Sequence, residues 1–312
     1  MIDLYLALPA FILGVVLLYK GSDILVEGTS KAALRLGVST LIISVILVGF
    51  GTSAPEFAIS VGAAIQHEAD ISVGNIIGSC IANLLLVLGI SALIRPISIN
   101  KSIFKREMAI MLGATVFLFI FSLVGLLDEY HYIGGVVFLV LFALFICFFV
   151  RCAKNERGTT THSSNGSLKK NIMFIILGIA GVVLGAYLLI ESAICFADLL
   201  GIDKLIIAMS LVAVGTSLPE LVVSAMASYK KESDIAVGNV LGSNVFNILL
   251  ILGASALFIP LNAVFSLDHI LILLGVTLVM FPIVYTGHII SRIEGVFLLV
   301  LYSLFIWYIF FM

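Results

Sequence analysis

One phrase of sequence occurs twice in this chain, and each copy places an acidic residue inside an apolar segment. The letters GTSAPE at residues 51–56 return as GTSLPE at residues 215–220, and each copy is followed at the same distances by Val-Gly-Asn, Gly-Ser and a further Asn. At an offset of 164 residues, 29 of 57 aligned pairs are identical without a gap. Ionisable residues are costly in apolar membrane segments and are candidates for function there. The duplication therefore predicts one site built from two halves, with Glu56 and Glu220 in it.

The composition indicates which solvent surrounds the chain. It is 62% hydrophobic and 11% charged, with a mean hydropathy of +1.27, which is typical of a polytopic helical membrane protein. The net charge of −2 comes with no basic stripe, which argues against a nucleic-acid partner. The four cysteines lack the spacing of a zinc site, and no GxxxxGK[ST] loop for a nucleotide is present. We expect a protein that is not an enzyme and has no cofactor.

Apolar segments long enough to cross a bilayer recur along the whole chain. Five segments separate each copy of the phrase from the other, and an odd number turns the second copy upside down in the membrane. Such inverted repeats are typical of transporters that bind their substrate at the midplane. We therefore predict an all-α polytopic membrane protein with two inverted-topology five-helix repeats. Its ten transmembrane helices are expected near residues 4–29, 38–66, 71–93, 104–126, 132–151, 171–197, 204–229, 235–258, 268–286 and 292–311.

These segments divide the chain into parts. Residues 1–151 form the first five-helix repeat, 152–170 a polar linker and 171–312 the second repeat, and the duplicated cores are at about 37–93 and 201–257. Lys and Arg gather in alternate loops, as expected for short cytoplasmic loops. We expect a multi-pass cell-membrane protein with both termini outside and the linker in the cytoplasm; the expected outer loops carry only Lys204 as a basic residue.

Proline inside each phrase predicts a broken helix. Proline lacks the N–H donor and clashes with the carbonyl four residues earlier, so Pro55 and Pro219 free the carbonyls of Gly51 and Gly215. A break of this kind survives in a bilayer only where it lines a cavity. We therefore expect the breaks at the midplane, with the freed carbonyls facing a site.

The candidate side chains near each break all carry oxygen atoms. Helical spacing places Thr52 with Glu56, and Thr216 with Glu220, on one face of a helix. Hard cations such as Ca²⁺, Na⁺ and Mg²⁺ take oxygen ligands, so the set excludes a thiolate or imidazole cage. Two carboxylates neutralise one divalent or two monovalent cations. By the same spacing, the remaining candidates form two pairs: Ser79 with Asn83, and Ser243 with Asn247.

At these residues the chain resembles the Ca²⁺/cation antiporter superfamily, most closely its prokaryotic and archaeal Na⁺/Ca²⁺ exchanger branch. The phrases GTSAPE…GNIIGSCIAN and GTSLPE…GNVLGSNVFN carry the resemblance. It implies Ca²⁺ held between Glu56 and Glu220. It also implies a first and a sixth span that slide across the other eight, and transport without ATP. Na⁺ sites are implied among the same glutamates and Thr52, Ser53, Ser79, Thr216, Ser217 and Ser243.

One position departs from this pattern. Archaeal exchangers often have Asp where this chain has Asn247, and K⁺-dependent relatives have Asp there too, so Asn247 argues against K⁺ cotransport. Two alternatives remain beside Na⁺/Ca²⁺ antiport. An H⁺/Ca²⁺ exchanger of the same fold usually carries a GNxxE-like phrase, which this chain lacks. A cation channel also lines its path with oxygens, but broken inverted repeats favour a carrier.

Charges in the first span have a simpler interpretation. Lys20, Asp23 and Glu27 are spaced to pair with one another on one helix face, and Glu191 lies in the corresponding sixth span. We expect an internal ion pair near the inner interface and place none of these residues in the site. Stoichiometry and oligomeric state are not predicted.

Overall fold

The protein is mostly helical and membrane-embedded, as predicted. The computed structural model describes residues 4–99, 101–156, 167–199, 215–261, 267–285 and 287–311. Within this part, seven helices are long and apolar enough to cross a membrane, or eight if a bent pair counts as one span. A shorter apolar helix covers Asp268–Ile283.

The elements follow the predicted apolar segments, with polar ends that extend several helices. Helix α1 continues to Leu36 and α8 to Glu156, beyond the predicted ends at 29 and 151. The linker residues 157–166 and residues 204–214 of the predicted seventh span lie outside the described residues. In chain order the elements are α1 (Leu4–Leu36), α2 (Thr40–Ile43), η1 (Ser44–Val48), α3 (Gly49–Thr52), α4 (Ala54–Ile65), α5 (Ala69–Ala82), η2 (Asn83–Val87), α6 (Leu88–Ile94), β1 (Ile97–Ser98), α7 (Lys101–Leu123), α8 (His131–Glu156), α9 (Leu168–Leu199), α12 (Leu218–Tyr229), α13 (Ser233–Val245), η4 (Phe246–Ile251), α14 (Leu252–Ser255), α15 (Leu267–Tyr285), β2 (Ile289–Ile290) and α16 (Arg292–Phe311).

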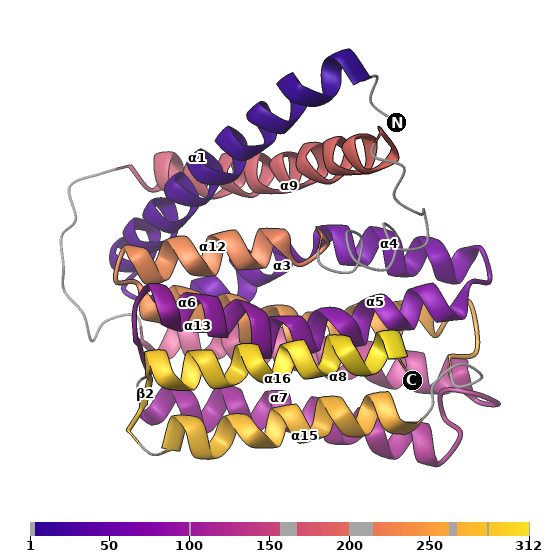
Figure 1. Cartoon of the computed structure of the whole chain (residues 1–312). Coiled ribbons are helices and arrows are strands. Elements are labelled where there is room, and N and C mark those ends of the chain that lie inside the picture. Colours follow the sequence, from indigo (N-terminus) through magenta and orange to yellow (C-terminus); the bar gives the residue numbers. More distant parts are fainter. Residues whose placement is uncertain are drawn as a thin grey trace.

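The two spans that carry the Gly-Ser-x-x-x-Asn phrases lie at the centre of the bundle. Of the apolar windows, 78% of the one in Ala69–Ile94 and 94% of the one in Ser233–Ser255 is buried, against 11% to 39% in the other candidate spans. In Figure 1, α5, α6 and α13 lie between a layer formed by α12, α3 and α4 and a layer that includes α15 and α7. Polar side chains on these central helices are therefore shielded from lipid.

The predicted break in the second span is present. Ser53 has φ −81° and ψ 9°, and the helices before and after it meet at a bend of 49°. Pro55 lies in the first turn of α4, where its missing N–H is not needed. Ser217 has almost the same conformation, φ −84° and ψ 4°, immediately before α12. The two helices that carry the glutamates thus start in the same way.

Within the described part of the chain, three π-helical segments that the sequence did not reveal adjoin these regions. Segment η1 leads into the break, η2 begins at Asn83 and η4 contains Asn247. A π-turn holds one more residue than an α-turn and is often found at functional sites. The extra residue in each segment therefore rotates the side chains that follow it about the helix axis.

Helices α1 and α9 cross each other through glycines and lie together at one side of the bundle (Figure 1). A Cβ added to Gly14 would lie 2.9 Å from the carbonyl oxygen of Gly185, and one added to Gly21 would lie 2.8 Å from the backbone nitrogen of Val182. Such close backbone approach gives van der Waals packing that lipid cannot replace. We therefore describe the α1–α9 pair as one packed unit.

The loops expected on the inner side meet at one end of the bundle. Strands β1 and β2 pair antiparallel, with Ile97 opposite Ile290. The Ser98 amide donates to Ser233 Oγ at 3.2 Å, and the Ser39 amide donates to Glu156 Oε2 at 2.8 Å. Two loops expected on the outer side also contact each other, because the Leu261 amide donates to the Leu127 carbonyl at 2.7 Å.

The charged residues of α1 do not form the expected internal ion pair. Asp23 pairs with Lys230 in the α12–α13 turn at 2.6 Å, and Glu27 pairs with Lys31 one turn further along α1. Ser30 adds a hydrogen bond to Glu232 at 2.8 Å. The expected partners are wrong: Asp23 pairs with a residue of the α12–α13 turn, which spacing within one helix could not reveal, and Glu27 pairs within α1 but with Lys31. These bonds join α1 to the α12–α13 turn, and we call them the inner tether.

Candidate cation-binding site

The two glutamates of the repeated phrase lie at the beginning of matching half-helices. Glu56 is in the first turn of α4 and Glu220 is in the first turn of α12, and both side chains are 0% exposed. The positive end of a helix dipole favours a negative charge in this position. The breaks therefore turn two carboxylates into the protein interior and stabilise their charge.

Glu220 is held by hydroxyl groups from both halves of the chain. Ser53 Oγ donates to Glu220 Oε1 at 3.0 Å, and Ser243 Oγ donates to the same oxygen at 3.1 Å. The second oxygen, Oε2, has no partner among the described residues. One carboxylate oxygen is thus fixed in place while the other is left for a ligand.

Glu56 is less constrained than Glu220. Neither of its carboxylate oxygens has a hydrogen-bond partner within the part of the chain that the structure describes. The two carboxylates are also close enough to repel each other electrostatically. Burying unpaired like charges is costly, and a bound cation would remove most of that cost. The pair therefore has the chemistry of a site for a cation.

Two asparagines connect the half-sites in a crossed pattern. Asn239 accepts from Thr52 Oγ1 at 3.0 Å, and Asn75 accepts from Thr216 Oγ1 at 3.2 Å. Each bond joins one half of the chain to the other. The expected site set did not include these asparagines, although their signal, the repeated Val-Gly-Asn, is part of the duplicated sequence.

The predicted serine and asparagine candidates have different surroundings. Ser79 Oγ lies 3.4 Å from Thr216 Oγ1, and Ser243 Oγ lies 3.4 Å from Thr52 Oγ1. Asn83 donates to Asn244 Oδ1 at 3.0 Å. Several buried polar atoms have no partner among the described residues: Asn83 Oδ1, both amide atoms of Asn247, and Ser217 Oγ.

The two glycines with freed carbonyls pack against one helix. A Cβ on Gly51 would collide with Ile179, and one on Gly215 would lie 2.7 Å from Ile190 Cδ1. Both isoleucines belong to α9. Helix α9 therefore contacts the chain at both breaks.

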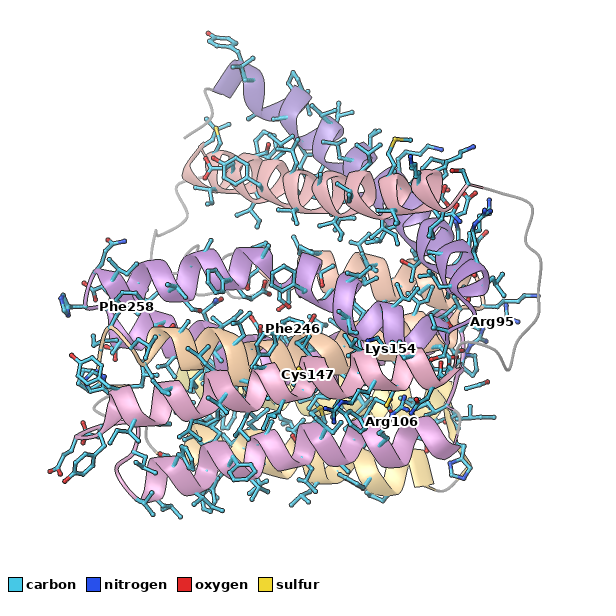
Figure 2. The ribbon with its side chains drawn as sticks, turned by 180° about the vertical axis from the view of Figure 1, so that it is seen from behind. Arg95, Arg106, Cys147, Lys154, Phe246 and Phe258 are labelled. Carbon is cyan, nitrogen blue, oxygen red and sulfur yellow. The ribbon has the colours of Figure 1, made fainter. Side chains whose placement is uncertain are left out.

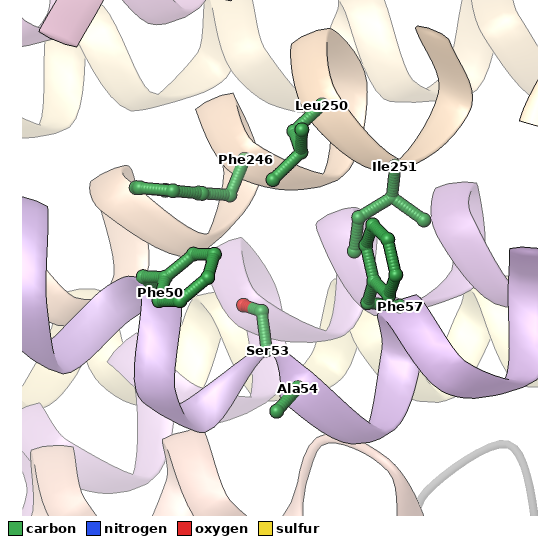
Figure 3. A pocket seen from close by; sticks show the side chains of 7 residues that line it. All are labelled: Phe50, Ser53, Ala54, Phe57, Phe246, Leu250 and Ile251. Carbon is green, nitrogen blue, oxygen red and sulfur yellow. The ribbon is translucent and has the colours of Figure 1, made fainter. Parts of the chain in front are cut away.

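An apolar cavity of about 130 Å³ lies beside the first break. Figure 3 shows Ser53 between Phe50 and Phe57, and Ser53 is the only polar side chain among the seven drawn. Because Ser53 also donates to Glu220, one side chain of the cavity wall is in direct contact with a site carboxylate. Its apolar walls do not suit a hydrated cation.

The ligand types fit a hard cation. The polar atoms around Glu56 and Glu220 are carboxylate, hydroxyl and amide oxygens, and the described residues contain no cluster of three or more His, Cys, Asp or Glu. Cys80 is buried nearby, with Sγ 3.9 Å from the carbonyl oxygen of Asn244, and all four cysteines are free. Oxygen sets of this kind suit Ca²⁺ and Na⁺ rather than thiophilic metals.

Comparisons with known proteins agree with this chemistry. The family model described as sodium/calcium exchanger protein matches residues 6–151 and 170–311. The chain is 37% identical to the sodium/calcium exchanger MaX1 of Methanosarcina acetivorans, with 95% of this chain and 96% of the relative covered. It is 36% identical to an uncharacterized membrane protein of Methanocaldococcus jannaschii, with 96% of each covered.

A solved structure gives the same result for the fold. The sodium-calcium exchanger NCX_Mj, soaked with zero Na⁺ and Ca²⁺, matches with a TM-score of 0.85 and 34% identity, over 97% of this chain and 98% of that one. The match covers both halves of the chain, including the helices that carry the repeated phrases. The chain belongs to the sodium/calcium exchanger family.

Proposed function

We propose that this exchanger extrudes Ca²⁺ across the cell membrane in return for Na⁺, by alternating access. The observation that carries the proposal is the pair of buried carboxylates with unpartnered oxygens, surrounded by hydroxyl groups from both halves of the chain. Because the same two acids serve either load, Ca²⁺ and Na⁺ compete for them. Competition at a site that opens to one side at a time gives antiport.

The proposed ligands come from both repeats. Glu56 and Glu220 neutralise Ca²⁺, and hydroxyl and amide oxygens complete the coordination of either ion. The unpartnered atoms of Asn83, Asn247 and Ser217 support their inclusion. The full proposed set is the side chains of Thr52, Ser53, Glu56, Ser79, Asn83, Thr216, Ser217, Glu220, Ser243 and Asn247, with the carbonyls of Gly51 and Gly215 as additional ligands.

We further propose ten spans in two inverted repeats, 1–151 and 171–312, joined by the 152–170 linker. The loop contacts support this arrangement, because the loops expected on the inner side contact one another at one end. Figure 2 shows Arg95, Arg106 and Lys154 toward one end of the bundle and Phe258 at the other. Under the positive-inside rule the basic end is cytoplasmic, so both termini face outward.

The α1–α9 pair is the proposed moving part. Its two helices pack on each other through glycine backbones, and the inner tether joins it to the α12–α13 turn by polar bonds that water can replace. The pair also packs on the bundle through apolar side chains, because Val26 of α1 and Val182 of α9 share a buried cluster with Val223 of α12. We propose that the pair slides along this apolar contact. The orientation of the loops is tested separately, by introducing single cysteines at Lys231 and Glu129 and following their labelling by an impermeant thiol reagent in right-side-out vesicles; we expect labelling at 129 only.

Transport itself is tested by ⁴⁵Ca²⁺ uptake into proteoliposomes with Na⁺, K⁺ and pH gradients imposed one at a time. We expect uptake that requires a Na⁺ gradient, saturates with Ca²⁺ and responds to membrane potential. Uptake driven by a pH gradient without Na⁺ would instead establish H⁺/Ca²⁺ exchange. Flux that needs no counter-ion and does not saturate would establish a channel.

A further inference from the structure

Asn75 and Asn239 occupy equivalent positions in the two repeats and make the same set of bonds. Asn239 Nδ2 donates to the Glu220 carbonyl at 3.2 Å and to Ser224 Oγ at 3.0 Å. Asn75 Nδ2 donates to the Glu56 carbonyl at 3.4 Å and to Ser60 Oγ at 2.9 Å. Each amide is therefore anchored to the backbone of the glutamate in its own repeat.

The glutamate carbonyl determines which way each amide faces. Asparagine presents an acceptor oxygen on one side and an NH₂ donor group on the other. A carbonyl oxygen can only accept, so the NH₂ group must face it. The amide oxygen is then directed at the threonine of the opposite repeat, Thr52 for Asn239 and Thr216 for Asn75.

This orientation decides what the threonine hydroxyls can do. A hydroxyl has one proton to donate and two lone pairs to offer. Facing an amide oxygen, Thr52 and Thr216 donate their proton to the protein; Thr52 has the Val48 carbonyl at 3.1 Å as a further acceptor. Their lone pairs are then left for a cation. A hydroxyl that pointed its proton toward the ion would repel it.

We propose that Asn75 and Asn239 are positioning residues that hold Thr216 and Thr52 as oxygen ligands, and that they set the affinity for Na⁺ more than the affinity for Ca²⁺. Na⁺ carries a single charge and depends more on neutral oxygens, whereas Ca²⁺ is held chiefly by the two carboxylates. The proposal rests on the proposed Na⁺/Ca²⁺ antiport. It adds that each threonine ligand is fixed by the opposite repeat, so that neither half-site is complete alone.

A double-mutant cycle tests this in proteoliposomes. Asn239→Ala is expected to raise the Na⁺ concentration for half-maximal ⁴⁵Ca²⁺ exchange about 5–10-fold, as for the loss of one hydrogen bond. The maximal rate at saturating Na⁺ and the half-saturating Ca²⁺ concentration are expected to change less than about twofold. In a Thr52→Val background, which removes the hydroxyl, Asn239→Ala should have no further effect on Na⁺.

Asn244 provides the matched control. It is a buried asparagine on the same helix, and within the described residues it bonds to Asn83, Cys80 and Met111 rather than to a threonine. Asn244→Ala should therefore have the same effect on Na⁺ with or without Thr52→Val. Thr52→Ser, which keeps the hydroxyl, should restore wild-type Na⁺ dependence.

The outcomes separate the two proposals. Wild-type protein without Na⁺-dependent uptake contradicts the antiport, whatever the variants do. Wild-type transport with additive effects of Asn239→Ala and Thr52→Val, or with equal losses for Na⁺ and Ca²⁺, overturns only the positioning role. If Asn239→Ala does not fold, the cycle of Asn75→Ala with Thr216→Val gives the same decision, because Asn75 is only half-buried.

Discussion

The two repeats carry the same phrase and yet hold their glutamates differently. Glu220 Oε1 accepts two hydroxyl bonds, whereas the oxygens of Glu56 accept none among the described residues. Asn239 is fully buried, but its counterpart Asn75 is half-buried. The duplication therefore supplies two similar sets of candidate ligands, of which one is fixed by hydrogen bonds and the other is left adaptable. The proposed exchange of two ions of different charge would benefit from this division.

The largest expected effect comes from removing either charge. Glu56→Gln and Glu220→Gln should each abolish Na⁺-dependent ⁴⁵Ca²⁺ uptake, since losing one partner of a buried charge pair costs about 3–5 kcal/mol, or roughly a hundredfold or more in affinity. Uptake that survives in Glu220→Gln would refute its role as a ligand. Glu→Asp at each position sharpens the comparison: at 220 the shorter side chain also loses two hydroxyl bonds, so we expect the weaker Ca²⁺ binding there.

A smaller effect is expected where the second repeat packs on the first. A Cβ on Gly242 of α13 would lie 2.6 Å from the Val45 carbonyl oxygen in η1. Gly242→Ala should therefore destabilise the protein by about 1–3 kcal/mol, the usual cost of overpacking, measured as a lower thermal midpoint in detergent. Gly113→Ala is the control, because an added Cβ there meets nothing within 4 Å. Equal midpoints for the two variants would contradict this packing.

A third prediction concerns a position at which the repeats differ. Asn244 donates to the Cys80 carbonyl at 3.1 Å and accepts from Asn83, while the equivalent residue in the first repeat is Cys80 itself. Asn244→Cys makes the two phrases alike and leaves buried polar groups unpaired, which costs about 1–3 kcal/mol. Thermal unfolding in detergent measures the loss, and Cys80→Ser, which keeps the backbone acceptor, should leave the midpoint nearly unchanged. An unchanged midpoint in Asn244→Cys would contradict a stabilising role for the hydrogen bonds of Asn244.

The smallest effect is expected at the inner tether, which involves the first repeat through α1 and the second through Lys230. Lys230→Met removes a partly exposed ion pair, worth about 0.2–1 kcal/mol, and should change the inward-to-outward ratio by no more than about fivefold. The ratio is measured by labelling a cysteine introduced at Phe50, which lines the cavity beside the first break, with a membrane-impermeant thiol reagent from each side in turn. The charge-swapped double variant Asp23→Lys, Lys230→Asp should restore the wild-type inward-to-outward ratio. A ratio that stays shifted in this double variant would rule out the ion pair as its cause.

Some of this arrangement could be predicted from particular residues. Pro55 predicted the break at Ser53, because its missing N–H and its ring act locally whatever the surroundings. Glu56 and Glu220 were predicted as site residues because an unpaired charge is unfavourable in the apolar interior of a membrane. The family and the helical membrane fold followed from the same duplicated letters. The break, the family and the helical membrane fold are confirmed. The ligand roles of Glu56 and Glu220 stay predictions.

Other features could not be predicted, because they depend on contacts between distant segments. The i to i+5 bonds of η2 and η4 have no letter pattern that separates them from α-helix. The partner of Asp23 lies 207 residues further along the chain, beyond any spacing rule. Asn244, which stands where the first repeat has Cys80, joins Asn83 to the backbone of α5. The crossed asparagine bonds likewise appear only once the repeats face each other.

Helix α9 has a mechanical consequence for the fidelity of exchange. Ile179 packs on Gly51 and Ile190 on Gly215, and the two isoleucines are eleven residues apart, about 16 Å along one helix. If α9 moves as proposed, both isoleucines leave their glycines in the same step, because one rigid helix carries both. The two glutamate-bearing helices would then be released together. Such coupling would suppress slippage, in which one ion crosses without its counter-ion and dissipates the gradient.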